Sequence, residues 1–332
     1  MIAVRSFAKI NLGLKIGPAR ADGFHELRTI YQTLALHDVI RVHVQPGSGI
    51  EIRCNNPRVP LDESNTCYKV AEHVMKTAKA SAKVIIQIDK RLPVQGGLGA
   101  GSSNAIATML GLERALGTKI STDDKMRIAT DVGSDVPLFL IGGTVLGIGH
   151  GEEVYPLQDL PIMHLVVVTP PIAVSTPKAF AQWDALVGQE AELTAAEAAG
   201  TINRFGQAVF AWLGESVLSP AVSASEPVSG VPAMGGDRAE TPLLDLVRAG
   251  IENDFERVVF PEYPDLREVK RVLQREGARY ASLSGSGSTL YGLFGFGEEA
   301  QAAAASMCAS GYAAVATTTL TRDEYWKSVV RG

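Results

Sequence analysis

The chain of 332 residues has few cysteines, no excess of positive charge and no long apolar run, and each shortage excludes a class of protein. Its three cysteines, Cys54, Cys67 and Cys308, stand far apart and form no Cys-x-x-Cys pair. Because an odd number of cysteines fits no disulfide framework, they indicate free thiols in a reducing compartment. We therefore expect a cytoplasmic protein.

Charge and hydropathy exclude two further kinds of partner. With 31 Lys and Arg against 36 Asp and Glu, the net charge is −5, whereas affinity for nucleic acid depends on basic side chains that neutralise many phosphates. No apolar run approaches the roughly 18 residues of a membrane span. Residues 1–11 lack a positively charged segment followed by a long apolar one, so we expect no signal peptide, no membrane partner and no nucleic-acid partner.

The composition is that of a globular protein. Hydrophobic residues make up 46% of the chain and charged residues 20%, which suffices for a sizeable core. At about 100–200 residues per domain, the length predicts two domains, which we place at 1–158 and 159–332. Residues 216–241 consist mainly of Ser, Ala, Pro, Gly and Val, and this composition predicts a flexible insertion in the second domain.

Hydrophobic spacing predicts both strands and helices. Runs of β-branched and other apolar residues predict strands over 84–88 and 164–169. Apolar residues at helical spacing predict a helix over 64–80, with Ser64 or Asn65 as its cap. Further elements are expected as helices over 243–249, 265–276 and 298–309, and as a strand, glycine loop and strand over 281–294.

The stretch from Gly96 to Ser103 is the most informative motif of the chain. Glycines alternate in it, two serines follow, and helical spacing continues to Gly117. Such a loop lets the backbone approach a ligand closely, and the unpaired N–H groups at a helix start bind phosphate. The alternatives are a plain strand-to-helix turn and serines that only cap the helix.

This loop does not match the widespread nucleotide motifs. A P-loop needs a Lys after its last glycine, and no Lys follows Gly101. The dinucleotide fingerprint fails because serine and asparagine, not glycine, stand where its last glycine would fall when counted from Gly97 or Gly99. The His-Arg-Asp and Asp-Phe-Gly signatures of protein kinases are missing as well.

The chain instead resembles the GHMP kinases, which phosphorylate small-molecule alcohols. Residues 93–105 read Pro-Val-Gln-Gly-Gly-Leu-Gly-Ala-Gly-Ser-Ser-Asn-Ala, which closely resembles the ATP loop of that family. Further stretches resemble the branch that acts on a cytidyl diphosphate sugar alcohol, and the resemblance covers most of the chain except about 185–242. These stretches are 8–12 together with 20–27 and Gln32, then 133–147, and finally 282–290.

The resemblance implies a fold and a nucleotide site. The fold is a two-domain α+β fold, with an N-terminal domain like ribosomal protein S5 domain 2, a ferredoxin-like C-terminal domain and the active site in the cleft between them. Ser102 is implied as a contact of Mg²⁺ that is bound with ATP. The implied ATP-binding residues are Pro93, Gly96, Gly97, Leu98, Gly99, Ala100, Gly101, Ser102 and Ser103.

Two charged residues stand where the resemblance implies catalysis. Asp135 lies in Gly-Ser-Asp-Val-Pro, where by itself it reads as a helix cap, and the resemblance makes it the base that takes the proton of the attacking hydroxyl. Lys9 lies among apolar residues of an expected strand, where the alternative is a side chain that reaches solvent. The resemblance implies that Lys9 pairs with Asp135 and steadies negative charge.

The resemblance also implies the residues that bind the alcohol substrate. The six histidines form no metal-binding cluster, but His25 is implied to hydrogen-bond a cytosine edge. Phe24, where many members have Tyr, and Phe180 would stack on the two faces of the base. Asn11 would bind the hydroxyl-bearing end, and Gly285 and Ser286 of a second glycine loop would border the substrate.

The implied reaction is ATP-dependent phosphorylation of the 2-hydroxyl of 4-diphosphocytidyl-2-C-methyl-D-erythritol in non-mevalonate isoprenoid synthesis, with ATP and Mg²⁺ as cofactors. One alternative is another GHMP kinase, of the homoserine or mevalonate type, although a substrate without a base has no use for Phe24, His25 and Phe180. A second is a non-catalytic ligand-binding regulator, which would have no need of Lys9 and Asp135 together. Monomer and homodimer both remain open.

Overall fold

The computed structural model describes residues 1–20, 23–94, 96–189 and 252–329. The expected insertion at 216–241 and the expected helix over 243–249 lie outside these residues. No helix in the described ranges is both long enough and apolar enough to cross a membrane.

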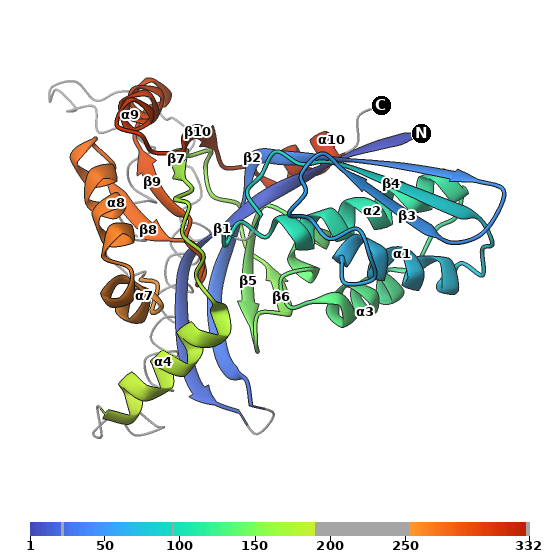
Figure 1. Cartoon of the computed structure of the whole chain (residues 1–332), viewed down its shortest axis with the longest axis horizontal. Coiled ribbons are helices and arrows are strands. Elements are labelled where there is room, and N and C mark those ends of the chain that lie inside the picture. Colours follow the sequence, from blue (N-terminus) through green and yellow to red (C-terminus); the bar gives the residue numbers. More distant parts are fainter. Residues whose placement is uncertain (21–22, 95, 190–251, 330–332) are drawn as a thin grey trace, which may run out of the picture.

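The first half of the chain forms a six-stranded sheet around one long antiparallel hairpin (Figure 1). The register between the two hairpin strands shifts at three places, between Phe7 and Lys9, between Asn11 and Gly13, and between Ile16 and Ala19. The strand over 84–88 is confirmed as the central part of β4, which pairs with β2. The strands are β1 (Ile2–Ala19), β2 (His25–Gln45), β3 (Ile50–Cys54), β4 (Lys83–Asp89), β5 (Thr144–Ile148) and β6 (Glu153–Pro156), in the order β3-β4-β2-β5-β6 with β1 on β2.

Helices α1 (Thr66–Thr77) and α2 (Ala100–Leu116) pack on this sheet, α3 (Thr122–Val132) packs on α1, and all three share the apolar core (Figure 1). Asn65 caps α1 by accepting a hydrogen bond from the N–H of Cys67 at 2.9 Å, as one of the two expected caps. A serine cap of α2 is wrong, because the helix begins after Gly99, and a glycine has no side chain that could cap it. It ends at Gly117, as expected.

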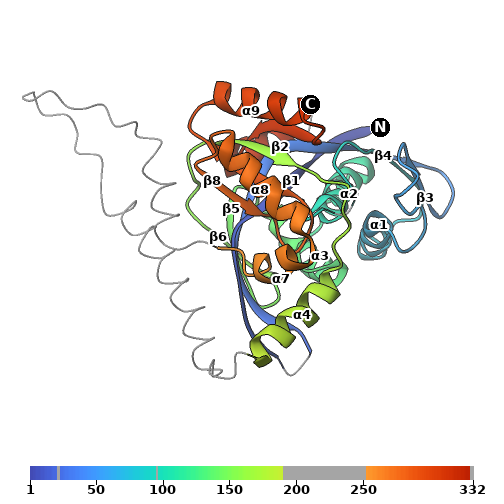
Figure 2. The same ribbon diagram turned by 60° about the vertical axis from the view of Figure 1, so that its left-hand side comes forward.

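The second half forms a four-stranded antiparallel sheet in the order β10-β7-β9-β8. Together with its helices it follows the strand-helix-strand-strand-helix-strand succession of the ferredoxin-like fold. The helices lie on one side of the sheet (Figure 2), and the elements expected over 164–169, 265–276, 281–294 and 298–309 are confirmed. The elements are β7 (His164–Val168), α4 (Thr176–Gln189), α7 (Glu256–Glu262), α8 (Pro264–Arg275), β8 (Tyr280–Leu283), β9 (Leu290–Phe294), α9 (Gly297–Ala309) and β10 (Ala314–Thr318).

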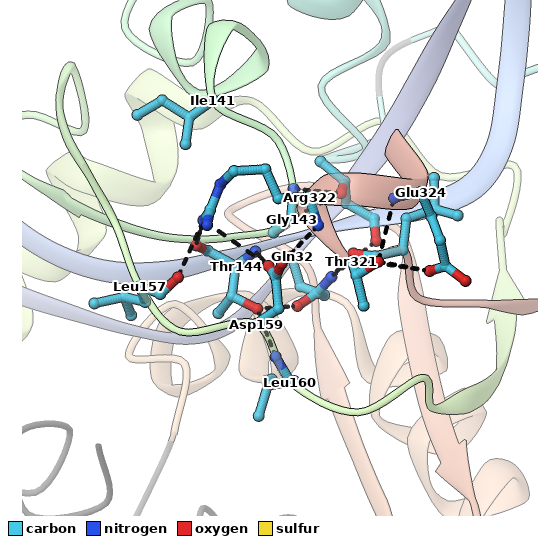
Figure 3. A network of polar contacts seen from close by, with 12 residues as sticks. Gln32, Ile141, Gly143, Thr144, Leu157, Asp159, Leu160, Thr321, Arg322 and Glu324 are labelled. Carbon is cyan, nitrogen blue, oxygen red and sulfur yellow. Dashed lines mark hydrogen bonds and ion pairs between the residues drawn. The ribbon is translucent and has the colours of Figure 1, made fainter. Parts of the chain in front are cut away.

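The end of the chain returns to the first sheet as α10 (Arg322–Val329). Figure 3 shows the polar network at its start, where the Arg322 guanidinium donates to the carbonyls of Thr144 and Leu157 at 2.9 and 3.0 Å. The backbone N–H of Arg322 donates to Asp159 at 2.7 Å. Tyr325, 2% exposed, belongs to the first core. The two sheets are thus joined by the last helix as well as by the chain between them.

Candidate active site

A cavity of about 1130 Å³ opens where the two sheets meet. Its walls come from β1, β2, the first glycine loop, the segment after α3, the start of α4 and the loop between β8 and β9. Of the residues expected in the site, Pro93, Leu98, Gly99, Ala100, Gly101 and Ser103 do not line the cavity. Those that do are Lys9, Asn11, Phe24, His25, Gly96, Gly97, Ser102, Asp135, Phe180, Gly285 and Ser286.

The two glycine loops interlock at one wall of this cavity. A Cβ atom on Gly97 would lie 2.1 Å from the carbonyl oxygen of Ser284, and one on Gly287 would lie 2.6 Å from the carbonyl carbon of Gly96. The Ser284 hydroxyl donates to the carbonyl of Gly97 at 2.9 Å, and the N–H of Thr289 donates to that of Gly96 at 3.1 Å. Only glycine allows this approach, so the second loop is at once a hairpin connection and a support of the first loop.

The start of α2 follows from the first loop and lies beside β1. The N–H of Lys9 donates to the carbonyl of Leu98 at 3.0 Å, and a Cβ atom on Gly99 would meet the Lys9 side chain at 2.9 Å. Because the first N–H groups of a helix have no partner within it, α2 offers donors and a partial positive charge to an anion. Ser102, in the first turn, lines the cavity there.

The charged pair at the cavity joins Lys9 of β1 to Asp135 of the segment between α3 and η1. Nζ of Lys9, a side chain only 3% exposed, lies 3.1 Å from Oδ2 of Asp135 and donates to Oδ1 of Asn11 at 2.8 Å. The Asn11 amide in turn donates to the Thr29 hydroxyl at 2.7 Å. Asp135 is 35% exposed at the cavity wall. A carboxylate at a cavity wall can accept a proton from a ligand hydroxyl that lies beside it.

Asp135 does not cap a helix. It precedes the 3-10 helix η1 (Pro137–Leu140), whose cap residue is Val136, and no side chain caps that helix. The expectation of a capping Asp, which the residue alone suggested, is therefore wrong. The side chain instead faces Lys9.

Tyr31 is a site residue that the sequence analysis missed. Its hydroxyl donates to Oδ1 of Asp135 at 3.0 Å, and Nζ of Lys9 lies 5.3 Å from the centre of its ring. Burial raises the pKa of Tyr31 well above its usual value, and the negative charge of Asp135 adds to the rise, so the phenol remains a neutral donor. The pairing of β1 with β2 could have indicated it, because Tyr31 in β2 lies opposite Asn11 in β1.

The other end of the cavity is lined with rings. His25, 7% exposed, lies with its ring stacked on Phe180 at a centroid distance of 5.1 Å and an interplanar angle of 13°. Phe24, 57% exposed, contacts His150 at 5.0 Å. Nε2 of His25 lies 2.6 Å from Oδ1 of Asp184, another residue that the sequence analysis missed. The expected base-binding residues therefore gather at this end. Phe180 contacts the ring of His25, whereas Phe24 contacts that of His150.

A hydroxyl contact joins α4 to the second glycine loop. The side chains of Thr176 and Ser286 lie 2.7 Å apart across the cavity wall. Behind that loop, the Asn253 amide donates to the carbonyls of Leu283 and Gly285 at 2.9 and 2.8 Å. Gly285 and Ser286 are therefore held from both sides.

Comparison with protein families finds two matches. The model of the GHMP kinases N terminal domain matches residues 65–143, and that of the GHMP kinases C terminal domain matches residues 240–313. The first match contains the glycine loop and Asp135, and the second contains the loop at 284–288.

Individual proteins are similar over most of the chain. A protein of Solibacter usitatus (strain Ellin6076) named 4-diphosphocytidyl-2-C-methyl-D-erythritol kinase is 36% identical over 291 residues, which cover 88% of this chain and 80% of that protein. A protein of Geobacter sulfurreducens (strain ATCC 51573 / DSM 12127 / PCA) with the same name is 32% identical over 319 residues, covering 96% and 99%.

Solved structures share the fold. A crystal structure of 4-(cytidine 5'-diphospho)-2C-methyl-D-erythritol kinase superposes with a TM-score of 0.69 at 28% identity, covering 96% of this chain and 99% of that one. The mevalonate kinase of L. major superposes with a TM-score of 0.67 at 15% identity, covering 97% and 96%. The second likeness shows the fold alone.

Proposed function

Because the chain belongs to the GHMP kinase family, and within it to the 4-diphosphocytidyl-2-C-methyl-D-erythritol kinases, we propose that it transfers the γ-phosphoryl group of ATP to the 2-hydroxyl of 4-diphosphocytidyl-2-C-methyl-D-erythritol. The products are the 2-phosphate and ADP, within non-mevalonate isoprenoid synthesis. The observation that carries the proposal is the Lys9–Asp135 pair, set between a phosphate-binding loop and a ring-lined pocket.

In this proposal Asp135 takes the proton of the 2-hydroxyl as its oxygen attacks the γ-phosphorus. The bond from that phosphorus to the bridging oxygen of ADP breaks, and ADP leaves with the bond's electron pair. Lys9 pairs with the carboxylate and offsets negative charge on the transferring group. Tyr31 holds the second carboxylate oxygen in place. Positioning and charge stabilisation are the main requirements of phosphoryl transfer, and this arrangement supplies both.

The residues present fit ATP. The first turn of α2 and the glycines before it leave the backbone free to approach phosphate, and Ser102 adds a hydroxyl at the cavity wall. Mg²⁺ fits as an ion carried by the ATP phosphates, with the Ser102 hydroxyl as an oxygen donor at the cavity wall. When bound, it offsets phosphate charge. Of the expected loop residues, those at the cavity face are Gly96, Gly97 and Ser102, and the others support the loop.

The ring-lined end binds the cytidyl group. His25 recognises the base edge, while Phe24 and Phe180 supply the ring faces on which a base stacks. Asn11, 2% exposed and bonded to Lys9, places the hydroxyl-bearing end beside Asp135. Gly285 and Ser286 border the diphosphate between the two ends.

We place the reaction in the cytoplasm, because all three cysteines are free thiols. We also place the domain boundary between 158 and 159, just before β7, with α10 crossing back to the first sheet. The proposal involves small molecules only, with no nucleic acid or membrane, and holds for a monomer or a homodimer.

A coupled assay of ADP release tests the function. The full chain would be given Mg²⁺ and ATP with the cytidyl substrate, and in parallel with mevalonate, homoserine and galactose. We expect turnover with the cytidyl substrate alone. Turnover with another alcohol would assign the chain to a different kinase reaction, and nucleotide binding without any turnover would indicate a regulator.

A further inference from the structure

Asp184 is a cavity residue that the proposed reaction leaves without a role. It lies on α4 four residues after Phe180, and residues at this spacing share one face of a helix. Its side chain is 57% exposed and lines the cavity. Within the described ranges its hydrogen-bond partner is His25, at 2.6 Å from Oδ1.

This contact orients the His25 ring. A carboxylate oxygen accepts hydrogen bonds, so Nε2 of His25 is the donor to Oδ1 of Asp184. Phe180 stacks on the face of the same imidazole, so the His25 ring is held on its face by Phe180 and at its edge by Asp184. The second oxygen, Oδ2, then remains as an acceptor for a ligand group.

Asp184 is also the acidic residue at the ring-lined end of the cavity. Among the described lining residues the carboxylates are those of Asp135 and Asp184. Asp135 is already bonded to Lys9 and Tyr31. A base stacked at the ring-lined end therefore meets a single carboxylate, that of Asp184.

We propose that Asp184 makes this cavity select a pyrimidine with an exocyclic amine over one with a carbonyl at the same position. The inference rests on the proposed function and names the group that decides its substrate. The amine of cytosine donates to Oδ2 of Asp184, whereas the carbonyl of uracil would place an acceptor against an acceptor. A carboxylate at a cavity wall distinguishes the two by roughly 10- to 100-fold in affinity.

Calorimetric titration tests the inference without turnover. Cytidine diphosphate and uridine diphosphate would be titrated into the full chain, with a non-hydrolysable ATP analogue in excess to fill the ATP site. The variants are Asp184→Asn and, as a control with the same change of charge, Asp123→Asn in the first turn of α3. Thermal unfolding of each variant would show that it is folded.

We expect the unchanged chain and Asp123→Asn to bind cytidine diphosphate roughly 10- to 100-fold more tightly than uridine diphosphate. Asp184→Asn should bring this ratio near one, because its amide can donate to the uracil carbonyl. Equal weakening of both ligands, or an unchanged ratio, would overturn the inference while leaving the kinase assay positive. Loss of both cytidine diphosphate binding and turnover in the unchanged chain would overturn the proposed function itself.

Discussion

The two ends of the cavity differ in how completely their side chains are paired. At the catalytic end Lys9 is buried, and the oxygens of Asp135 are held by Lys9 and Tyr31. At the base end Phe24 and Asp184 are each 57% exposed. The first arrangement joins two strands of one sheet to the segment before η1, all in the first half of the chain, whereas the second joins a strand, a turn and a helix that come from both halves of the chain. The contacts within the fold thus hold the proposed catalytic pair in place, while the proposed base site leaves Phe24 and Asp184 exposed at the cavity.

The largest effect is expected when the catalytic end loses its base. Asp135→Asn should lower kcat by roughly 10²- to 10⁴-fold, because an amide cannot take the proton of the attacking hydroxyl. Binding of cytidine diphosphate, measured by calorimetry, should change little, since the base end is untouched. Asp131→Asn, at an exposed position of α3, is the control. Near-normal turnover in Asp135→Asn would remove the base from the proposed reaction.

The second effect concerns the support of the catalytic end. Gly97→Ala should destabilise the protein more than Gly117→Ala, although both glycines have positive φ. At Gly117 the added Cβ meets nothing within 4 Å, so only the backbone strain of about 1–2 kcal/mol applies. At Gly97 the overlap with Ser284 adds about 1–3 kcal/mol. Urea unfolding measures both, and equal losses would show that the loops do not interlock.

The third effect separates the base end from the catalytic end. Phe180→Ala should raise the KM for the cytidyl substrate by roughly 10- to 100-fold, because the base loses a stacking face. The KM for ATP should stay the same. Phe296→Ala, an exposed phenylalanine outside the cavity, should leave both constants unchanged. A fall in kcat as large as that of Asp135→Asn would mean that the two ends do not act separately.

The smallest effect sharpens the description of the catalytic end. Tyr31→Phe should lower kcat by roughly 3- to 10-fold, since Asp135 keeps Lys9 but loses one donor. Burial raises the pKa of Tyr31 above its usual value of about 10. At every pH below about 10 the hydroxyl is therefore protonated and donates its hydrogen bond to Asp135. The ratio of kcat in the unchanged chain to kcat in Tyr31→Phe should therefore be constant from about pH 6 to about pH 9. A ratio that approaches one as the pH rises would contradict a neutral Tyr31. Tyr155→Phe, at an exposed position, is the control.

The sequence predicted the elements better than the contacts between them. Asn65, Gly117 and the β-branched run of β4 are local signals, and the structure places an element end or a strand at each. The serine cap of α2 failed because Gly99, with its positive φ, starts the helix earlier.

Contacts that need strand register or a distant helix were beyond local patterns. Tyr31 reaches Asp135 only because β2 pairs with β1, and Asp184 reaches His25 across 159 positions of sequence. The resemblance to a family supplied Lys9 and Asp135, which neither composition nor spacing could have joined. Tyr31 and Asp184 had no such precedent, so they could be identified only from the contacts that the fold creates.

The most direct test of the account is to follow the phosphorus itself. A ³¹P NMR time course of the full chain with Mg²⁺, ATP and the cytidyl substrate would show where the γ-phosphoryl group goes. The account predicts a new phosphomonoester resonance that grows in step with ADP while the diphosphate of the substrate remains intact. Growth of inorganic phosphate in its place would mean that water, not the hydroxyl beside Asp135, receives the group, and would contradict the account.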